Sequence, residues 1–221
     1  MLPYVLPFAL YLGLTYVVGM EDLKAHYAWL YGATVLLVGA VTTGLLYRRG
    51  LLRPHARIIP GIVVGLVGIA LWIGIYNLGW DQYLAAHLPT LIQPRPRPGF
   101  DPFSVLEQPS AWAFIAIRMV GLAVLVPVAE ELFWRGFLAR WLLDPDWQKQ
   151  PLGRFTPVSF AIVTLMFTLA HPEWLAAAVY CALLNLLIAW TRELWNCVVA
   201  HGVSNLVLGI YIVATWNWEL W

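Results

Sequence analysis

Apolar stretches long enough to cross a membrane are the feature that most constrains how this chain can fold. A helix needs about 20 mostly apolar residues to span the hydrocarbon core of a bilayer. Because that core offers the backbone no water, each such stretch must form its own hydrogen bonds as a helix. The stretches run over residues 3–20, 27–47, 58–80, 111–143, 156–171, 173–190 and 194–216. We therefore predict an all-α, polytopic transmembrane helix bundle with roughly seven to eight spans.

The composition excludes a water-soluble globular domain. Of the 221 residues, 61% are hydrophobic and only 11% are charged, whereas soluble domains average about 45–50% and about 25%. The formal net charge of +1 gives the chain no basic footprint for nucleic acid. Cys181 and Cys197 lie in apolar runs at a spacing that fits neither a disulfide scaffold nor a zinc knuckle, which predicts two small core residues. Membrane lipid is an expected partner, nucleic acid is not, and no oligomeric state is predicted.

The arginines predict the orientation in the membrane. Positively charged residues collect in cytoplasmic loops. Four of them crowd one short loop: Arg48, Arg49, Arg53 and Arg57. We therefore predict a multi-pass protein of the cell membrane (the cytoplasmic, or inner, membrane in a bacterium) with a cytoplasmic N-terminus.

Prolines mark two places where the chain can change direction. The stretch 111–143 is too long for one simple span, so it is either one tilted helix or two pieces broken near Pro127. Residues 93–100 read QPRPRPGF, and proline at every second position makes such a segment stiff and extended. The expected parts are N-terminal transmembrane helices (1–92), a Pro-rich linker (93–110) and a helical core (111–216).

Chemistry is to be sought among polar residues at membrane depth, because ionisable groups there are costly and usually functional. The N-terminal spans contain almost none. Three later segments carry them: Glu130, Glu131 and Arg135 in PVAEELFWRGF, His171 in FTLAHP, and His201 with Asn205 in HGVSNLVL. Arg118 interrupts a further apolar stretch, and we interpret it as a side chain that snorkels to the interface from the outer end of its span.

The adjacent glutamates cannot do the same job, because neighbours on a helix point about 100° apart. Glu131 and Arg135 stand at i and i+4 with the acid first, which favours an ion pair. Glu130 then has no counter-charge nearby in sequence, which makes it the candidate general base. The alternative is that both glutamates are solvated at the cytoplasmic end of a span, with Arg135 and Arg140 as helix-end cations.

Two further pairs share a helix face at a spacing of four residues. Phe167 lies four residues before His171, and Pro172 ends or kinks the helix beside the imidazole. His201 and Asn205 together can donate two hydrogen bonds to one developing oxyanion. Each has a structural alternative: His171 as a helix-end or interfacial residue, and the His201–Asn205 pair as a hydrogen-bonded contact between helices.

The ordered trio of motifs resembles a known family. Glu-Glu-x-x-x-Arg, Phe-x-x-x-His and His-x-x-x-Asn occur in this order on three successive apolar segments. This is similar to the CPBP family of intramembrane proteases, the CAAX-processing and bacteriocin-processing enzymes that include CAAX prenyl protease 2 and the Abi-like proteins. The resemblance covers roughly residues 110–212, and no motif position departs from the family pattern. It implies these catalytic-site residues: Glu130, Glu131, Arg135, His171, His201 and Asn205.

Other intramembrane protease classes fit the sequence poorly. The His-Glu-x-x-His motif of site-2 metalloproteases is absent from the sequence. A presenilin-like enzyme needs two aspartates inside spans, but every aspartate here falls in an expected loop. Ser204 lacks the Gly-x-Ser-x-Gly setting of an activated serine.

The residues and the resemblance together predict an endopeptidase that hydrolyses a peptide bond with an activated water. Glu130 is the expected base, His171 holds the water and helps to protonate the leaving amine, and His201 with Asn205 stabilises the oxyanion. The expected substrate is a CAAX-like tail, a leader peptide or a sorting-signal protein. No cofactor is expected. The alternative is zinc, since Glu130, His171 and His201 are suitable ligand types, although their spacing is less compact than in known zinc motifs.

A non-enzymatic protein is the rival interpretation. A catalytically silent membrane scaffold or regulator (an immunity or partner-binding protein) could keep the same fold, but such proteins usually lose a motif residue and none is lost here. A transporter is expected to have broken helices or inverted repeats in both halves. Here the polar residues at depth all lie in the C-terminal half, which favours the protease.

Overall fold

The computed structural model describes residues 1–51, 58–94 and 99–221. Arg53, Arg57 and residues 95–98 of the expected Pro-rich linker therefore lie outside the described residues. The described chain is helical throughout and contains no strand, which confirms the predicted all-α class.

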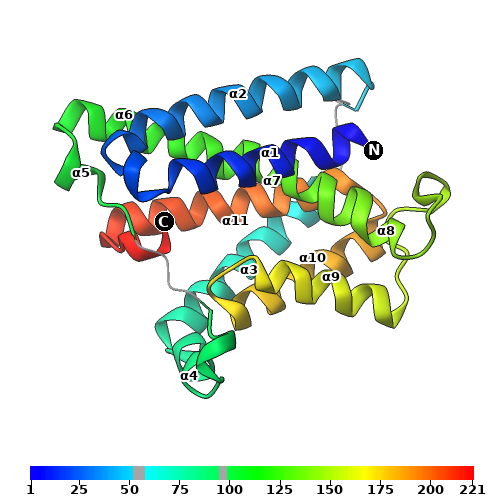
Figure 1. Ribbon diagram of the computed structural model, residues 1–221. Coiled ribbons are helices and arrows are strands. Elements are labelled where there is room, and N and C mark those ends of the chain that lie inside the picture. Colours follow the sequence, from blue (N-terminus) through cyan, green and yellow to red (C-terminus); the bar gives the residue numbers. More distant parts are fainter. Residues whose placement is uncertain (52–57, 95–98) are drawn as a thin grey trace.

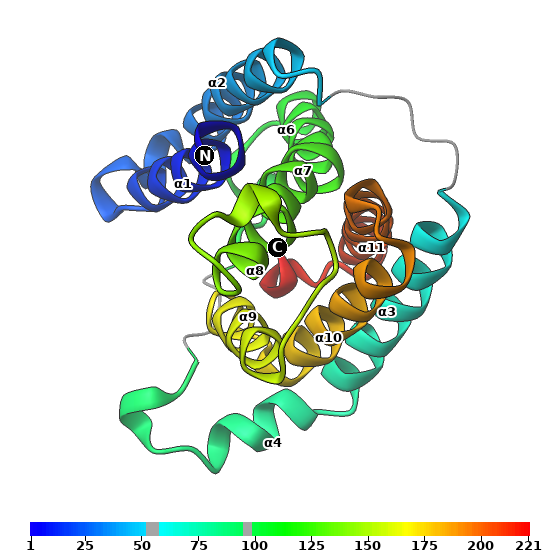
Figure 2. The same cartoon turned by 90° about the vertical axis from the view of Figure 1, so that its right-hand side faces the viewer.

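The longer helices run roughly side by side (Figure 1). The α-helices in chain order are α1 (Leu2–Val18), α2 (Tyr27–Arg48), α3 (Ile59–Asn77), α4 (Trp80–Ala86), α5 (Pro102–Val105), α6 (Gln108–Val120), α7 (Val126–Glu131), α8 (Ala139–Trp141), α9 (Pro157–Leu169), α10 (Trp174–Thr191) and α11 (Leu194–Thr215). Short 3₁₀ segments are η1 (Glu21–His26), η2 (Thr90–Ile92), η5 (Trp147–Lys149) and η6 (Trp218–Leu220). Two π-helical segments, η3 (Gly121–Leu125) and η4 (Leu132–Leu138), join α6, α7 and α8. Seen end-on, α6 and α7 lie between the α1–α2 pair and the helices α3, α9, α10 and α11 (Figure 2).

Residues 108–141 form one helix of 34 residues, so Pro127 does not divide the stretch into two spans. Proline lacks the N–H that an α-helix interior needs. Here Pro127 falls in the first turn of α7, directly after the wider π-helical turn η3. The local change of hydrogen-bond pattern therefore accommodates the missing donor without a break. Single π-helical turns are frequent at functional sites, and the Glu130–Glu131 pair lies between two of them.

Among the residues that the structure describes, five helices are long and apolar enough to cross a membrane. They are Glu21–Arg48, Ile59–Asn77, Gln108–Trp141, Trp174–Thr191 and Leu194–Thr215. The apolar helices α1 and α9 are shorter, so the expected count of seven to eight spans is supported only for these five. Helix α9 has 13 residues, about 20 Å, because a Thr156–Ser159 capping box starts it and Pro172 follows its end.

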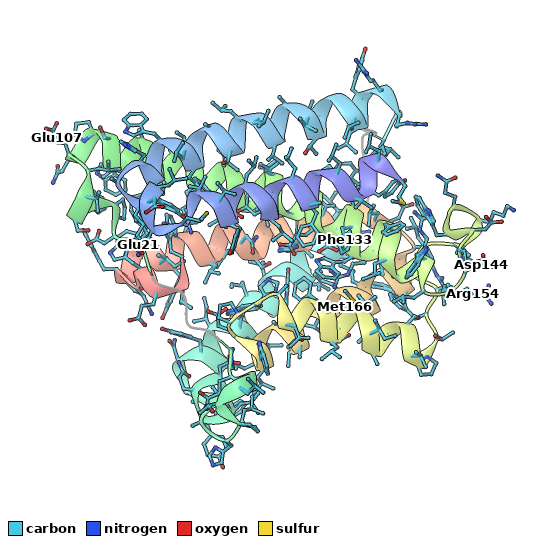
Figure 3. The ribbon with its side chains drawn as sticks, viewed as in Figure 1. Glu21, Glu107, Phe133, Asp144, Arg154 and Met166 are labelled. Carbon is cyan, nitrogen blue, oxygen red and sulfur yellow. The ribbon has the colours of Figure 1, made fainter. Side chains whose placement is uncertain are left out.

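Large apolar side chains lie exposed on the outside of the bundle, as expected of a membrane protein whose surface faces lipid. Trp29, Leu36 and Trp190 are each more than two-thirds exposed. Acidic Glu21 and Glu107 lie near one end of the bundle, whereas the loop with Asp144 and Arg154 lies at the other (Figure 3).

The N-terminal helices complete the same bundle as the C-terminal ones. Gly61 and Gly65 let α3 pack directly on α11, because a Cβ at either position would collide with a backbone carbonyl of α11. Small residues permit this kind of close helix contact in membranes. The amide N–H of Gly61 also donates to Asn196 Oδ1 across the interface (3.2 Å). Residues 1–92 and 111–216 therefore share one interior.

Candidate active site

The three motifs meet in the middle of the bundle. Glu130 and Glu131 lie on α7, and Arg135 lies one turn later on η4. His171 follows the end of α9, and His201 and Asn205 lie on α11. All of these except His171 and Asn205 are buried, with at most 9% of the side chain exposed. The alternative in which the two glutamates are solvated at a span end is therefore wrong.

His171 is oriented by the end of its own helix. The last carbonyls of a helix lack an intrahelical donor, and Pro172 prevents α9 from continuing. His171 Nδ1 lies 2.8 Å from the carbonyl oxygen of Phe167 and donates to it. The imidazole also stacks on the Phe167 ring, with the ring centroids 4.4 Å apart. A carbonyl only accepts, so Nδ1 carries the hydrogen of the neutral ring and Nε2 is the basic nitrogen.

Glu131, Arg135 and His201 form an enclosed network behind the cavity. Arg135 Nη1 donates to Glu131 Oε1 (3.0 Å), and His201 Nδ1 lies 2.8 Å from the same oxygen. Arg135 Nε donates to Asn185 Oδ1 (3.2 Å), and Nη2 contacts Cys181 through its carbonyl oxygen (3.3 Å) and Sγ (3.0 Å). All three nitrogens of this guanidinium therefore have acceptors, as a buried cation requires.

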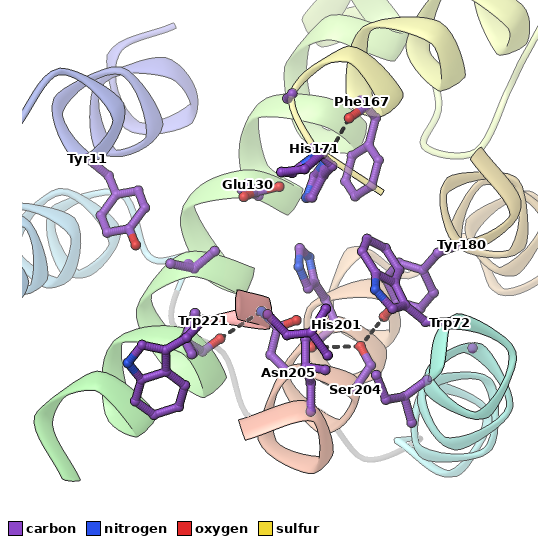
Figure 4. A pocket seen from close by; sticks show the side chains of 18 of the residues that line it. Tyr11, Trp72, Glu130, Phe167, His171, Tyr180, His201, Ser204, Asn205 and Trp221 are labelled. Carbon is purple, nitrogen blue, oxygen red and sulfur yellow. Dashed lines mark hydrogen bonds between the residues drawn. The ribbon is translucent and has the colours of Figure 1, made fainter. Parts of the chain in front are cut away.

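A cavity of about 350 Å³ opens in front of this network. It is bounded by residues of both halves of the chain, and the motif residues among them are Glu130, Phe167, His171, His201 and Asn205. In Figure 4, Glu130 and His171 lie on one side of this space, and His201 and Asn205 lie across from them. Glu131 and Arg135 do not line it. Four of the six predicted residues therefore belong to the cavity wall. The other two, Glu131 and Arg135, form an enclosed support behind it.

Glu130 presents its carboxylate to the cavity with one hydrogen bond from its own helix. Trp134 Nε1 donates to Glu130 Oε2 at 3.2 Å. Among the described residues, no cation forms an ion pair with Glu130, whereas Glu131 has two such partners. The expectation that Glu131, not Glu130, pairs with Arg135 is confirmed.

Asn205 connects the cavity wall to the π-helical turn before α7. In such a turn the Leu122 carbonyl would accept from the residue five positions later, which is Pro127 and has no N–H. Asn205 Nδ2 donates to this carbonyl oxygen instead (2.9 Å). Gly202 permits the approach, because a Cβ there would collide with the Ala123 carbonyl. One of the two amide hydrogens of Asn205 is therefore committed to the backbone.

The expectation that Arg118 snorkels to the interface is wrong. Its side chain is 8% exposed and lines the same cavity as Glu130. Nη1 donates to Tyr27 Oη (2.6 Å), and the guanidinium lies 4.9 Å from the Tyr31 ring centroid and 5.0 Å from that of Trp221. Aromatic faces attract a cation and replace part of its water here. Trp221, the last residue of the chain, could not be placed beside Arg118 from local sequence.

Sequence reasoning missed Asn185, which is fully buried and accepts from Arg135. The signal in the sequence was an amide in the middle of the apolar run 173–190. It was missed because an amide is polar but not ionisable. The two cysteines are buried and not disulfide-bonded, as predicted.

A metal-binding cluster is not formed in the described part of the chain. No group of three or more His, Cys, Asp or Glu side chains there is close enough to hold a metal ion. The suggested zinc ligands Glu130, His171 and His201 do not meet that condition in this geometry. Nδ1 of His171 is already bonded to the Phe167 carbonyl oxygen, and Nδ1 of His201 to Glu131 Oε1.

Comparison with known families bears on the same residues. Residues 111–207 match the family model described as type II CAAX prenyl endopeptidase Rce1-like. The chain carries an Rce1-like segment. This confirms the resemblance to CPBP proteases that the three motifs predicted, and the Rce1-like segment contains all seven motif residues. Neither the curated proteins nor the solved structures gave a match to the chain.

Proposed function

We propose that this protein is an intramembrane endopeptidase that hydrolyses a peptide bond with a water activated by Glu130 and His171. One observation carries the proposal: Glu130, His171, His201 and Asn205 face one cavity, while the ion pair that supports them is enclosed behind it. The Rce1-like segment supports a protease in particular, because the family model that residues 111–207 match describes endopeptidases.

In this mechanism Glu130 takes a proton from the attacking water. His171 Nε2 accepts a hydrogen bond from the same water, because its Nδ1 hydrogen is held by the Phe167 carbonyl. The proton gathered by Glu130 or His171 then passes to the leaving amine, so that the peptide C–N bond breaks and no covalent intermediate forms. Reagents directed at serine or cysteine are therefore expected not to inhibit.

His201 and Asn205 stabilise the oxyanion of the tetrahedral intermediate. Nδ1 of His201 donates to Glu131, so Nε2 carries a hydrogen only in the imidazolium form. Asn205 contributes its second amide hydrogen, since the first is bonded to Leu122. Each such donor typically lowers the barrier by about 2.7–4 kcal/mol.

No metal ion takes part in the mechanism that we propose. The basis is that Glu130, His171 and His201 do not form a group that could hold a metal ion in the described part of the chain. Activity that survives a strong chelator, in protein shown by elemental analysis to be metal-free, is the expected result. Loss of activity that returns on addition of Zn²⁺ would contradict this part of the proposal.

We further propose that α1 and α9 are embedded in the membrane together with the five longer helices, giving a multi-pass protein with its N-terminus in the cytoplasm. Arg154 lies at the end of the bundle opposite Glu21 and Glu107 (Figure 3), which supports this orientation by the positive-inside rule. Accessibility of single engineered cysteines to a membrane-impermeant reagent in intact cells tests it.

The substrate class that we propose is a CAAX-like tail, a leader peptide or a sorting-signal protein. The test needs no prior choice among them. Wild type, Glu130→Gln and the exposed control Glu107→Gln are expressed in the native host lacking the gene, and all protein N- and C-termini are compared by mass spectrometry. New termini with wild type and Glu107→Gln, but not with Glu130→Gln, are expected. Identical termini in all strains, with Glu130→Gln rescuing the deletion phenotype, would favour a scaffold instead.

A further inference from the structure

Arg118 is a buried cation whose charge the protein does not balance. Its side chain is 8% exposed, yet no carboxylate among the described residues forms an ion pair with it. Within the described part of the chain it donates one hydrogen bond, to Tyr27 Oη. Its Nε is enclosed and has no acceptor there. Leaving a buried charge without acceptors is costly, so a ligand that brings an acceptor would be stabilised here.

Two other enclosed donors in the wall of the same cavity are also without acceptors. The indole N–H groups of Trp72 and Trp221 have no hydrogen-bond partner among the described residues, and both side chains line the cavity that Glu130 and Arg118 line. Trp221 lies beside Arg118, with its ring centroid 5.0 Å from the guanidinium. This part of the wall therefore suits a group of the occupant that brings acceptors and a negative charge.

We propose that Arg118 binds a carboxylate of the peptide substrate while Glu130 attacks the scissile bond. Guanidinium pairs with carboxylate through two parallel hydrogen bonds, which a lysine cannot reproduce. The carboxylate has two possible sources, the C-terminus of the substrate or an acidic side chain. This inference rests on the proposed protease function and assigns its specificity to one residue outside the three motifs.

The helix that carries both residues limits where the bond is cut. Arg118 and Glu130 are twelve residues apart on the continuous helix of residues 108–141, about 18 Å along its axis. An extended peptide covers about 3.3 Å per residue. Because both side chains reach toward the occupant, the cleaved bond is at most about five residues from the bound carboxylate.

Binding and cleavage are measured separately to test the inference. Three pools of synthetic random-sequence decapeptides are used: one with a free C-terminal acid and no acidic residue, one with a C-terminal amide and no acidic residue, and one with a C-terminal amide and a single aspartate. Each pool is incubated with the Glu130→Gln protein in nanodiscs, and retained peptides are quantified by mass spectrometry. We expect one of the two pools that carry a carboxylate to be retained about tenfold more than the amidated pool without acidic residues. The pool that is retained more strongly identifies the source of the carboxylate.

Three variants on the Glu130→Gln background locate the effect. Arg118→Gln should reduce the ratio of retained carboxylate peptides to retained peptides without a carboxylate to about one. Arg118→Lys should retain only part of this preference. Arg140→Gln, which removes an arginine that does not line the cavity, should leave it unchanged. Equal retention of all three pools by Glu130→Gln alone would overturn the inference, even if Arg118→Gln failed to fold. An unchanged preference in folded Arg118→Gln would overturn it as well.

Cleavage by the otherwise wild-type protein distinguishes this inference from the proposed function. Cutting within about five residues of the carboxylate, in the pool that binds, supports both. Retention of a carboxylate pool without any cleavage contradicts the protease and leaves the Arg118 site standing. Cleavage of all pools alike contradicts the Arg118 site and leaves the protease standing.

Discussion

Arg118 and Arg135, two of the buried arginines of the long central helix, have opposite surroundings. Arg135 is 1% exposed, and each of its nitrogens donates to an acceptor supplied by Glu131, Asn185 or Cys181. Arg118 is 8% exposed, rests on aromatic rings and has an enclosed nitrogen without an acceptor. Burial alone therefore does not assign a role. A satisfied cation belongs to the enclosed support, whereas an unsatisfied one lines the cavity and is suited to a ligand.

Replacing Arg135 should have the largest effect on stability. Arg135→Met leaves the enclosed Glu131 carboxylate without its cation, and breaking a buried pair in this way costs about 3–5 kcal/mol. Unfolding in mixed micelles measures the loss. The matched control is Lys149→Met, which removes a cation from the exposed Asp146 pair and should cost no more than about 1 kcal/mol. If both variants lose the same free energy of unfolding, the ion pair of Arg135 stabilises the fold no more than an exposed pair does, which would contradict its role in the enclosed support.

Asn205 combines a structural and a catalytic role. One of its amide hydrogens is bonded to the Leu122 carbonyl oxygen, and the other is the proposed donor to the oxyanion. Asn205→Ala should reduce kcat/KM by about 10²–10³, the loss of one oxyanion donor. The free energy of unfolding should fall by only about 1 kcal/mol, the usual net value of one hydrogen bond. Asn77→Ala, which changes an exposed amide at the end of α3, should leave activity unchanged. A variant that loses stability but keeps full activity would make Asn205 purely structural.

Asn185 belongs entirely to the support and should behave in the opposite way. Asn185→Ala leaves Arg135 Nε without its acceptor, which should lower the free energy of unfolding by about 1–3 kcal/mol. Turnover by the fraction that remains folded should stay close to wild type, because Asn185 does not line the cavity. If activity per folded molecule collapses while stability is retained, the division between support and wall is wrong.

Asp81 gives the smallest expected effect and a pH dependence. It lies on α4, outside the spans, and accepts from the Leu175 N–H at the start of α10 (2.6 Å). Burial raises the pKa of the Asp81 carboxyl, and the N–H groups of Leu175 and Ala176 offset the increase only in part. The folded protein therefore binds this proton more tightly than the unfolded chain. That stabilisation is complete below the unfolded pKa of about 3.9 and is lost as pH rises through the folded pKa.

The variant Asp81→Asn keeps an acceptor for Leu175 but does not titrate. Melting temperatures of both proteins between about pH 4 and about pH 8 should show wild type losing stability relative to the variant as pH rises. A constant difference over this range would show that Asp81 does not titrate abnormally.

The sequence predicted features that depend on local spacing. The helical class followed from apolar runs, and the Glu131–Arg135 pair followed from a separation of one turn, as did the assignment of Glu130 to a different face. These relations are fixed within a single helix, so neighbouring segments do not alter them.

Features that depend on contacts between distant segments could not be predicted in this way. Arg118 is enclosed by Tyr27, Tyr31 and Trp221, which come from α2 and from the end of the chain. The continuity of residues 108–141 depends on a π-helical turn before Pro127, which apolar periodicity does not reveal. The count of seven to eight spans stays a prediction, because five helices are long enough to cross a membrane and the capping box at Thr156 and the proline at 172 leave α9 only 13 residues long.

The central claim is that Glu130 performs the chemistry and Glu131 supports it, and paired substitutions of these neighbours test it most directly. In one purified series, Glu130→Gln and Glu131→Gln are compared with wild type for peptide cleavage and for the free energy of unfolding. Glu130→Gln should reduce cleavage by about 10²–10⁴ and cost no more than about 1 kcal/mol of stability, because the amide oxygen still accepts from Trp134. Glu131→Gln should lose about 3–5 kcal/mol of stability, because it leaves Arg135 buried without its carboxylate. A stable Glu130→Gln protein that cleaves as well as wild type would contradict the account.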